Sequence, residues 1–311
     1  MSSAELVYLS RADVVSLMPP LATQVDLVER TYLAMAAGRV ELPPKPAVHP
    51  RANGFIHAMP SYLADEDLPA LKWIGAFRSN KRRGLPYISG LIVINDGETG
   101  FPIGVIDAME ITAVRTAAAS GVCVRRWAPP GWTRAAIIGC GEQGRYHARV
   151  LNMLNSAVSI AAYDIHPERP GQLEGCVEPA SDAQNAVAGA DVIIAGVPIV
   201  KDPSPPIAPD WLGERWLALP IDFDASFQAE SVAAAGLFLS DDVQQFEAYR
   251  GYGHFSGWPK PVASVGSGLE DGSTGERVLC CNLGVGALDA AFGRVVLDRA
   301  LEEGIGTRLP L

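Results

Sequence analysis

Hydrophobic and polar positions follow two different rhythms along the chain. In residues 11–38 apolar side chains recur at helical spacing and Gly38 follows the last of them, so this pattern predicts helix. From about residue 54 to 107, short apolar runs alternate with turn residues, which predicts an antiparallel or mixed sheet. Residues 110–128 combine small and apolar side chains and predict a helix that ends before Pro129.

From residue 133 the pattern changes to continuous apolar runs separated by segments of helix length. The runs "TRAAIIGCG", "VSIAAYD" and "ADVIIAGVP" are typical of buried parallel strands. Prolines and a glycine interrupt residues 165–180, so the helix expected there is short or missing. Ser181 and Gln184 have the spacing of an N-cap and its third helical residue. Residues 286–304 predict an amphipathic helix.

These patterns predict an α/β protein with two domains. A Rossmann-type dinucleotide-binding domain is expected over residues 119–282, where parallel-type strands alternate with helices. An N-terminal α+β domain, expected to bind substrate and to dimerise, covers residues 1–118, and residues 283–311 are expected to return to it with their helix. The apolar runs of that domain have little helix to cover them, which favours pairing with a second copy.

Composition narrows the class of protein. The 311 residues are 48% hydrophobic, which is typical of a globular chain with a sizeable core. No apolar run approaches the roughly 18–20 residues of a membrane span, and the N-terminus lacks the features of a secretory signal. Five cysteines without paired spacing indicate reduced thiols, not a disulfide frame or a metal site, so we expect a cytoplasmic protein. The net charge of −10 argues against a nucleic-acid partner.

The stretch "AAIIGCGEQGRYHA", residues 135–148, has the spacing G-x-G-x-x-G between a predicted strand and a predicted helix. In dinucleotide-binding folds the first glycine permits the turn and the second lets the backbone approach the pyrophosphate. The third glycine lets the helix pack on the strand, and the helix N-terminus supplies N–H donors. The predicted cofactor contacts here are Gly139, Gly141, Glu142, Gln143 and Gly144.

Asp164 ends the next predicted strand, 20 residues after Gly144. This is the position from which an acidic side chain hydrogen-bonds the hydroxyls of the adenosine ribose. A carboxylate there repels a 2′-phosphate, and no arginine follows it directly, so the sequence predicts NAD as the cofactor and disfavours NADP. Val197, after the third strand of this domain, is also expected among the cofactor contacts.

Basic residues gather in the predicted N-terminal domain although the whole chain is acidic. Residues 45–83 hold seven basic residues against three acidic ones, which indicates either an anionic small ligand or a solvated basic loop. Lys72 lies in an otherwise apolar strand, and Arg115 lies in a helix of small and apolar residues. Because buried charges are costly unless they are paired or functional, each is either a ligand-binding residue or part of a structural ion pair.

Residues 71–120, which begin "LKWIGAF" and end "ITAVRTAAAS", resemble the ornithine cyclodeaminase/mu-crystallin family. The combination of K-W, N-D-x-E-T-G-x-P, R-T-A-A-x-S and a following G-x-G is specific, and similar stretches extend over nearly the full chain. Within the family, "PPKPAV", "LKWIG" and "IIGCG" most resemble the branch that makes 2,3-diaminopropionate, from which the interrupted segment 165–180 departs.

The resemblance implies NAD(P)-linked redox chemistry at the carbon–nitrogen bond of an amino acid, in a homodimer formed through the N-terminal domain. It implies that the substrate carboxylate is held by Lys45, Lys72 and Arg115, and that Asn282 lies near the cofactor. Members of the family include cyclodeaminases, amino-acid dehydrogenases, ketimine reductases and opine-like synthases.

The resemblance also implies a catalytic aspartate that faces the nicotinamide, at Asp222. The family motif normally reads glycine–alanine–aspartate and then proline, whereas this chain reads Pro220-Ile221-Asp222 with Asp224 two residues later. Either aspartate is therefore a candidate, and a helix N-cap is the alternative for Asp224.

We therefore expect an NAD-dependent oxidoreductase that acts on a small amino-acid-like carboxylate, with Asp222 and Lys72 as catalytic residues. The first alternative is a cyclodeaminase, or a diaminopropionate-synthase-like lyase, that recycles NAD within one turnover. The second is a non-catalytic protein that binds a dinucleotide and a small ligand. Segment 254–258 is a candidate substrate loop without an assigned mechanism, and the histidines are expected in packing or surface positions: His57, His147 and His254.

Overall fold

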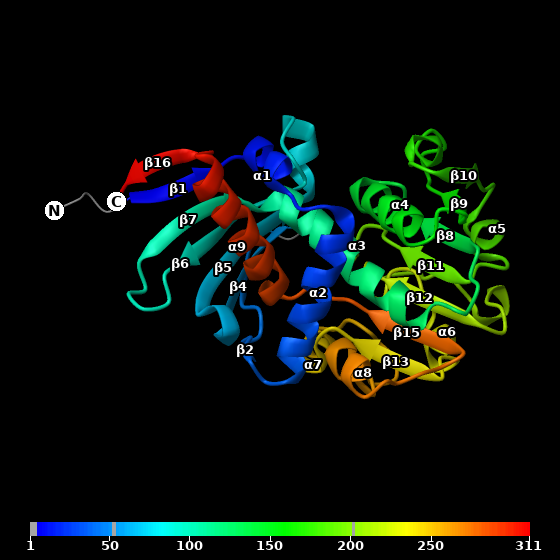
Figure 1. Cartoon of the computed structure of the whole chain (residues 1–311). Coiled ribbons are helices and arrows are strands. Elements are labelled where there is room, and N and C mark those ends of the chain that lie inside the picture. The colour runs from blue at the N-terminus through cyan, green and yellow to red at the C-terminus, as the bar shows by residue number, and fades with distance from the viewer. Residues whose placement is uncertain (1–4, 52–53, 201–202) are drawn as a thin grey trace. The chain divides into compact units, whose positions relative to one another are not determined.

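The computed structural model describes residues 5–51, 54–200 and 203–311. The chain divides into two compact units, which we call unit 1 (Met1–Arg115 with Val285–Leu311) and unit 2 (Thr116–Gly284). The division falls within helix α3 (Ala108–Trp127), coloured cyan to green in Figure 1. Within the described ranges no helix has both the length and the apolar character that a membrane crossing requires.

Unit 1 contains an eight-stranded sheet in which β16, β1, β7, β6, β5, β4 and β2 follow one another and β3 pairs with β4. Among the described strands only β1 and β7 run parallel, so the mixed sheet expected from the short apolar runs is confirmed. Its strands are β1 (Glu5–Leu9), β2 (Val40–Glu41), β3 (Ala47–Arg51), β4 (Gly54–Leu63), β5 (Leu68–Phe77), β6 (Ile88–Asn95), β7 (Pro102–Asp107) and β16 (Thr307–Pro310).

The helices of unit 1 are α1 (Arg11–Leu17), α2 (Leu21–Ala36), the first part of α3 and α9 (Gly286–Glu303), with short turns η1 (Ala64–Glu66) and η2 (Arg78–Arg83). The helical region expected over residues 11–38 is thus two helices, because Pro19 and Pro20 interrupt the backbone ladder between them. Helix α9 packs on β4, β5 and β6, as Figure 1 shows.

The side chains of strand β5 alternate between the two faces of the unit 1 sheet, which differ in burial. Lys72 and Ile74 are buried on the face that α9 covers, whereas Trp73 between them points the other way and is 45% exposed. Leu91 of β6 is the direct cross-strand partner of Trp73 and is 40% exposed. One face of the sheet therefore belongs to the hydrophobic core, and the other exposes the apolar cross-strand pair Trp73 and Leu91.

Unit 2 contains an eight-stranded sheet in the order β10, β9, β8, β11, β12, β15, β13, β14, and every neighbouring pair is parallel. The continuous apolar runs expected to form parallel strands do so, because helices and loops cover both faces of such a sheet. The strands are β8 (Arg134–Ile138), β9 (Ser159–Tyr163), β10 (Cys176–Pro179), β11 (Val192–Ala195), β12 (Trp216–Pro220), β13 (Leu237–Ser240), β14 (Ala263–Ser264) and β15 (Arg277–Cys281).

The helices of unit 2 are short except for α4 and the second part of α3, and the crossover from β9 to β10 contains only the turn η3 (Pro170–Gln172). This agrees with the interruptions seen in residues 165–180. The helices are the second part of α3, α4 (Glu142–Leu154), α5 (Ala183–Val187), α6 (Ala229–Ala233), α7 (Val243–Gly251) and α8 (Val265–Glu270), and a second short turn is η4 (Pro209–Trp211).

The N-cap of α5 lies one residue later than the sequence pattern predicts. Asp182, not Ser181, caps the helix, and its carboxylate accepts a hydrogen bond from the backbone N–H of Asn185 at 2.8 Å. The Ser181 hydroxyl instead donates to the Asp182 carboxylate at 3.1 Å.

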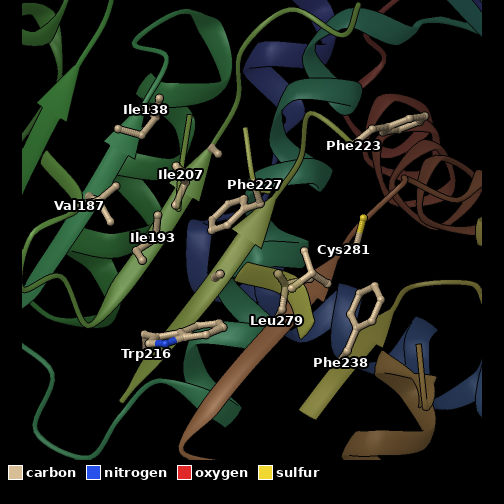
Figure 2. Close-up of a cluster of buried hydrophobic side chains, with 14 of the residues drawn as sticks. Ile138, Val187, Ile193, Ile207, Trp216, Phe223, Phe227, Phe238, Leu279 and Cys281 are labelled. Atoms are coloured by element: carbon tan, nitrogen blue, oxygen red, sulfur yellow. The ribbon is translucent and has the colours of Figure 1, made fainter. Parts of the chain in front are cut away.

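The core of unit 2 fixes the strands whose ends carry the candidate site. Figure 2 shows Ile193, Trp216 and Leu279, which come from the neighbouring strands β11, β12 and β15 and are at most 1% exposed. Each such side chain contributes roughly 1.5–3 kcal/mol by burial. Because this packing is dense, the carboxyl ends of these strands are held at fixed positions.

Candidate active site

Polar side chains and glycines follow the carboxyl ends of several parallel strands of unit 2. Because these strands run in the same direction, their carboxyl ends share one edge of the sheet, where open α/β sheets bind ligands. Of the residues predicted from the sequence, those at this edge are Gly139 after β8, Asp164 after β9, Val197 after β11, Asp222 after β12 and Asn282 after β15.

The three glycines of the loop after β8 have different surroundings. Gly139 has a φ of 93°, and a Cβ there would lie 2.5 Å from the carbonyl oxygen of Gly196. A Cβ on Gly144 would lie 2.5 Å from the carbonyl oxygen of Gly139, so the helix approaches the strand end closely. A Cβ on Gly141 would have no protein atom within 4 Å. Two of the glycines are thus required by the chain's own packing, while Gly141 borders open space.

Helix α4 begins next to this open space. Its N-cap is Gly141, which makes no side-chain capping bond to the first N–H groups of the helix. Such N–H groups and the helix dipole favour an anion, although Glu142 adds a negative charge in the first turn. The side-chain oxygen of Gln143 is buried without a hydrogen-bond partner in the structure. This end of α4 therefore offers donors to a phosphate and an acceptor to a ligand N–H or O–H group.

Asp164 is already engaged in several hydrogen bonds. Its Oδ2 accepts from the Cys140 N–H at 2.8 Å, and its Oδ1 accepts from the His166 N–H at 2.9 Å. Arg169 approaches the same Oδ1 at 3.4 Å. The carboxylate is thus oriented by the glycine loop on one side and by the chain that follows β9 on the other.

Asp222 is a buried carboxyl group with one oxygen fixed and one oxygen without a partner. Its Oδ2 accepts from the Val197 N–H at 3.0 Å and from the Ser226 hydroxyl at 2.5 Å, while its buried Oδ1 has no hydrogen-bond partner in the structure. Burial raises the pKa of Asp222 to about 7, against the opposing effect of these two hydrogen bonds. The group can therefore gain or lose a proton near neutral pH through an oxygen that the chain leaves available.

Asp224 has a different environment. Its Oδ2 accepts from the Phe255 N–H at 2.6 Å, and its Oδ1 lies 3.2 Å from Nδ1 of His254. Burial raises the pKa of Asp224, but the hydrogen bonds from His254 and Phe255 outweigh it and leave the pKa below its usual value. Asp224 therefore anchors the 254–258 segment, which lines a cavity of about 330 Å³.

The residue between the two aspartates has an unusual backbone conformation. Phe223 has a φ of 63°, a backbone conformation that bulky side chains seldom adopt. The N-cap alternative for Asp224 is wrong, since α6 begins at Ala229 with Gln228 as its N-cap.

Asn282 and His147 are among the other buried polar residues of unit 2. The side-chain nitrogen of Asn282 contacts Sγ of Cys123 at 3.7 Å, and its Oδ1 has no hydrogen-bond partner in the structure. His147 lies between the Gln143 carbonyl, to which Nδ1 donates at 2.8 Å, and the Ser120 hydroxyl, 2.9 Å from Nε2. Burial lowers the pKa of His147 to about 4, so this histidine is a neutral packing residue.

In unit 1 the structure brings two predicted cations to one carboxylate. Lys72 Nζ lies 2.7 Å from Asp289 Oδ2, and Arg115 Nε lies 3.3 Å from Asp289 Oδ1. The side chains of Lys72 and Asp289 are both 1% exposed. The ion-pair alternative for Lys72 and Arg115 is thus present in the structure, but two cations share a single anion. The three side chains carry a net positive charge in a buried place, which favours a second anion.

Lys45 belongs to the same group of charges. Burial lowers the pKa of Lys72 to about 7, and the like charges of Arg115 and Lys45 add to this shift against the opposing charge of Asp289. Burial and the charges of Lys45, His49 and Lys72 also lower the pKa of His57 to about 4. The three residues predicted to hold a substrate carboxylate therefore lie within electrostatic reach of one another.

Sequence reasoning missed Asp289, His254 and Arg169. Asp289 had a signal, because it is the only charged residue in the apolar stretch "GALDAAFG" at the start of α9. His254 and Arg169 had none, since each contacts an aspartate only through the folding of a loop.

Comparison with known proteins identifies full-length relatives. The ornithine cyclodeaminase/mu-crystallin family matches residues 5–221 of the chain. The nodulation efficiency protein NfeD of Rhizobium meliloti is 34% identical over 317 residues, which span 98% of this chain and 98% of the relative.

Two solved structures share the fold. The Delta(1)-pyrroline-2-carboxylate reductase of Thermococcus litoralis, in complex with NADH and L-proline, matches with a TM-score of 0.84 over 97% of this chain and 99% of its own, at 24% identity. An archaeal alanine dehydrogenase dimer with bound NAD matches with a TM-score of 0.86 over 99% and 100%, at 24% identity. The α/β fold class with a Rossmann-type sheet, expected from the sequence, is confirmed.

Proposed function

Because the chain belongs to the ornithine cyclodeaminase/mu-crystallin family, we propose that it is an NAD-dependent oxidoreductase acting on the α carbon–nitrogen bond of an amino acid or imino acid. Two proteins of the same fold are a reductase bound to NADH and L-proline and an alanine dehydrogenase bound to NAD. The observation that carries the proposal is the buried carboxyl of Asp222, whose Oδ1 has no hydrogen-bond partner in the structure and which lies at the same sheet edge as the glycine loop.

The residues at this edge fit NAD. Gly141 leaves room beside the N-terminus of α4 for a pyrophosphate, and the Asp164 carboxylate, which the Cys140 N–H holds at the glycine loop, can accept hydrogen bonds from ribose hydroxyls. Glu142, Gln143, Val197 and Asn282 complete the proposed cofactor contacts. When bound, NAD accepts the hydride, or in its reduced form donates it.

Asp222 is the proposed acid and base. An amino acid must lose a proton from its amine before an imine forms, and Oδ1 of Asp222 can take that proton. In the reverse direction the protonated carboxyl returns it. Because burial raises the pKa of Asp222 to about 7, both forms are populated near neutral pH, which suits a group that must work in both roles.

Lys45, Lys72 and Arg115 are the proposed substrate anchor in unit 1. A substrate carboxylate neutralises the net positive charge that Asp289 leaves uncompensated, and its negative charge favours the protonated form of Lys72. The guanidinium of Arg115 can bind a carboxylate bidentately, whereas lysine acts as a point charge. All three residues of this proposed anchor belong to unit 1.

We further propose a homodimer formed through the open face of the unit 1 sheet. The cross-strand pair Trp73 and Leu91 lies on this face, and both side chains are exposed in the single chain. Covering such a face with a second copy removes apolar surface from water.

A substrate screen tests the proposal. Amino acids, and pairs of keto acids with amines, are incubated with NAD or NADH, while NADH absorbance and product mass are followed. Net NADH formation or consumption supports the oxidoreductase. A product without net change in NADH identifies a lyase that recycles the cofactor, and cofactor binding without any product identifies a binding protein. Asp222→Asn serves as the control that separates turnover at this site from a contaminating activity.

A further inference from the structure

Segment 254–258, to which the proposed reaction gives no role, contains a histidine with one ring nitrogen fixed and the other available. Nδ1 of His254 lies 3.2 Å from Asp224 Oδ1, where it donates to the carboxylate. Nε2 has no hydrogen-bond partner among the described residues, and the side chain is 21% exposed. His254 also lines the cavity of about 330 Å³. The imidazole therefore has a nitrogen that the chain itself does not use, at the wall of a cavity.

The backbone on both sides of this pair is strained. Phe223, directly before Asp224, has a φ of 63°, and Phe255, directly after His254, has a φ of 58°. Such conformations cost roughly 1–3 kcal/mol each and persist only where surrounding contacts hold them. Here the Phe255 N–H donates to Asp224 at 2.6 Å, and the Phe223 ring packs edge-on against His254 with centroids 5.2 Å apart. The imidazole is therefore held in a fixed orientation at the cavity.

The other lining residues offer hydrogen-bond donors. Ser256 and Gly257 are exposed, and neither the Ser256 hydroxyl nor their two backbone N–H groups has a partner among the described residues. Arg250 lines the cavity as well, whereas no aspartate or glutamate of the described chain does. A lining with donors and without a carboxylate favours an anionic ligand.

The ion pairs of the adjoining helix leave positive charge beside the cavity. Glu247 of α7 lies 3.8 Å from Arg250 and 3.3 Å from Lys260, so one carboxylate is shared by two cations. Nη2 of Arg250 also donates to the carbonyls of Trp258 and Pro259 at 2.7 and 2.8 Å. Arg250 therefore holds the end of the segment in place while its charge stays at the cavity wall.

The groups that face the imidazole favour its protonated form. Asp224 approaches from the loop after β12, and an opposite charge at this distance stabilises the imidazolium. Tyr249 faces it from α7, with ring centroids 6.0 Å apart, and burial raises the pKa of Tyr249 well above its usual value, so this residue stays neutral. An anion in the cavity adds a second negative charge beside the ring. Proton uptake by His254 and anion binding therefore support each other.

We propose that this cavity is a separate ligand site of unit 2, which binds a small oxyanion, a carboxylate or a phosphate group, through His254 Nε2 and the Ser256 hydroxyl. The imidazolium supplies a charge-assisted hydrogen bond and the serine a neutral one. A volume of about 330 Å³ is at the lower end of small-molecule sites. The proposal does not rest on the proposed function, since neither residue takes part in cofactor binding, substrate binding or proton transfer there.

Histidine NMR of the full chain tests the proposal. The chain has five histidines, and in protein labelled with carbon-13 at histidine Cε1 the signal of His254 is the one that His254→Gln lacks. Sodium sulfate and sodium acetate are titrated against sodium chloride at constant ionic strength, at pH 6 and at pH 8. Neither probe changes its charge between these values. Sulfate represents a phosphate group, and acetate represents a carboxylate.

The His254 signal should shift saturably with sulfate, with acetate or with both, and the probe that binds more tightly identifies the ligand group. Half-saturation should require about tenfold less probe at pH 6 than at pH 8, because protonated imidazole binds an anion more strongly. Ser256→Ala should raise the half-saturating concentration by about 2- to 10-fold, the range for a neutral hydrogen bond. This exposed side chain makes no contact that folding needs.

Ser156→Ala is the matched control. Ser156 is also an exposed serine in a turn of unit 2 without a hydrogen bond to the described residues, and it does not line the cavity. Its replacement should leave half-saturation unchanged. A His254 signal that does not move beyond the chloride reference overturns the proposal. So does equal half-saturation at the two pH values, or an effect of Ser256→Ala no larger than that of Ser156→Ala.

Discussion

Lys72 of β5 and Asp289 of α9 form an ion pair of 2.7 Å in the core of unit 1, and Asp289 also meets Arg115 at 3.3 Å. Breaking a buried ion pair from one side is costly because the remaining charge keeps its desolvation penalty. Removing the shared carboxylate should therefore destabilise this unit.

Asp289→Asn should lower the free energy of unfolding by about 3–5 kcal/mol at pH 6, where Lys72, whose pKa is about 7, is mostly protonated; urea denaturation measures the loss. The loss should be smaller at pH 9, since Lys72, whose pKa is already lowered to about 7, can then release its proton. Asp298→Asn on the same helix is the control. It breaks an exposed pair with Arg294 and should cost less than about 0.5 kcal/mol. Equal losses in the two variants would contradict the buried ion-pair account.

Arg115→Ala should weaken the transition-state binding of the substrate found in the screen by about 2–4 kcal/mol, because a desolvated charged contact is lost. The measurement is kcat/KM. NADH affinity, determined by titration, should hardly change, since Arg115 lies in unit 1 and the glycine loop lies in unit 2. Arg115→Lys keeps the positive charge but lacks the planar guanidinium, so its kcat/KM should lie between those of the wild type and Arg115→Ala. Normal kinetics in Arg115→Ala would place the carboxylate anchor elsewhere.

Asp222→Asn should reduce the rate by about 10²–10⁴-fold, the range for losing a general base, while NADH still binds. Asparagine preserves the shape of the side chain but cannot accept the proton. Asp224→Asn should affect the rate much less, because Asp224 is occupied by the Phe255 N–H and His254. Single-turnover kinetics compare the two. If Asp224→Asn showed the larger loss, the proton would move through the Asp224–His254 pair.

Asp222 also makes folding stability depend on pH. Burial raises its pKa from 3.8 to about 7, so between these values the folded chain holds a proton that the unfolded chain has released. The stabilisation is complete below about pH 4 and is lost as the pH rises through 7, at up to about 1.4 kcal/mol per pH unit. Asparagine does not titrate. Urea denaturation at pH 5 and pH 8 should therefore show Asp222→Asn gaining stability relative to wild type at the higher pH, and a constant difference would contradict the raised pKa.

Trp73→Lys should convert the proposed homodimer into monomers, because it places a charge in the centre of the apolar sheet face beside Leu91. Sedimentation should then give the mass of one 33.0 kDa chain at micromolar concentration, against twice that mass for wild type. Ile165→Lys, at another exposed apolar position but in unit 2, should leave the dimer intact. A wild-type protein that sediments as a monomer would contradict the dimer.

Local sequence was sufficient for parts of the molecule that depend on neighbouring residues. The glycine loop could be located because Gly139, Gly141 and Gly144 lie within a few residues of one another, so their spacing can be read directly from the sequence. The missing helix after β9 could be predicted from Pro167 and Pro170, since proline disrupts the interior of a helix.

Contacts between distant segments could not be predicted in this way. Arg115 and Asp289 are 174 residues apart, and Asp224 and His254 are 30 apart, so the shared anion and the histidine partner depend on how the chain returns. Likewise, nothing in "PIDFDAS" indicates the positive φ of Phe223, which lies between Asp222 and Asp224.

The discontinuous make-up of unit 1 has a consequence for the order in which the protein assembles during synthesis. Lys72 and Arg115 leave the ribosome long before Asp289, and the whole of unit 2 is made in between. Strand β1 likewise cannot form its antiparallel pairing with β16 until the other end of the described chain has been synthesised. Until α9 arrives, both cations lack their shared anion and the inner face of the β4–β6 sheet lacks its cover. The nascent unit 1 therefore passes through a long interval in which charge and apolar surface are both exposed, and its folding can be completed only after the segment inserted within it has been synthesised.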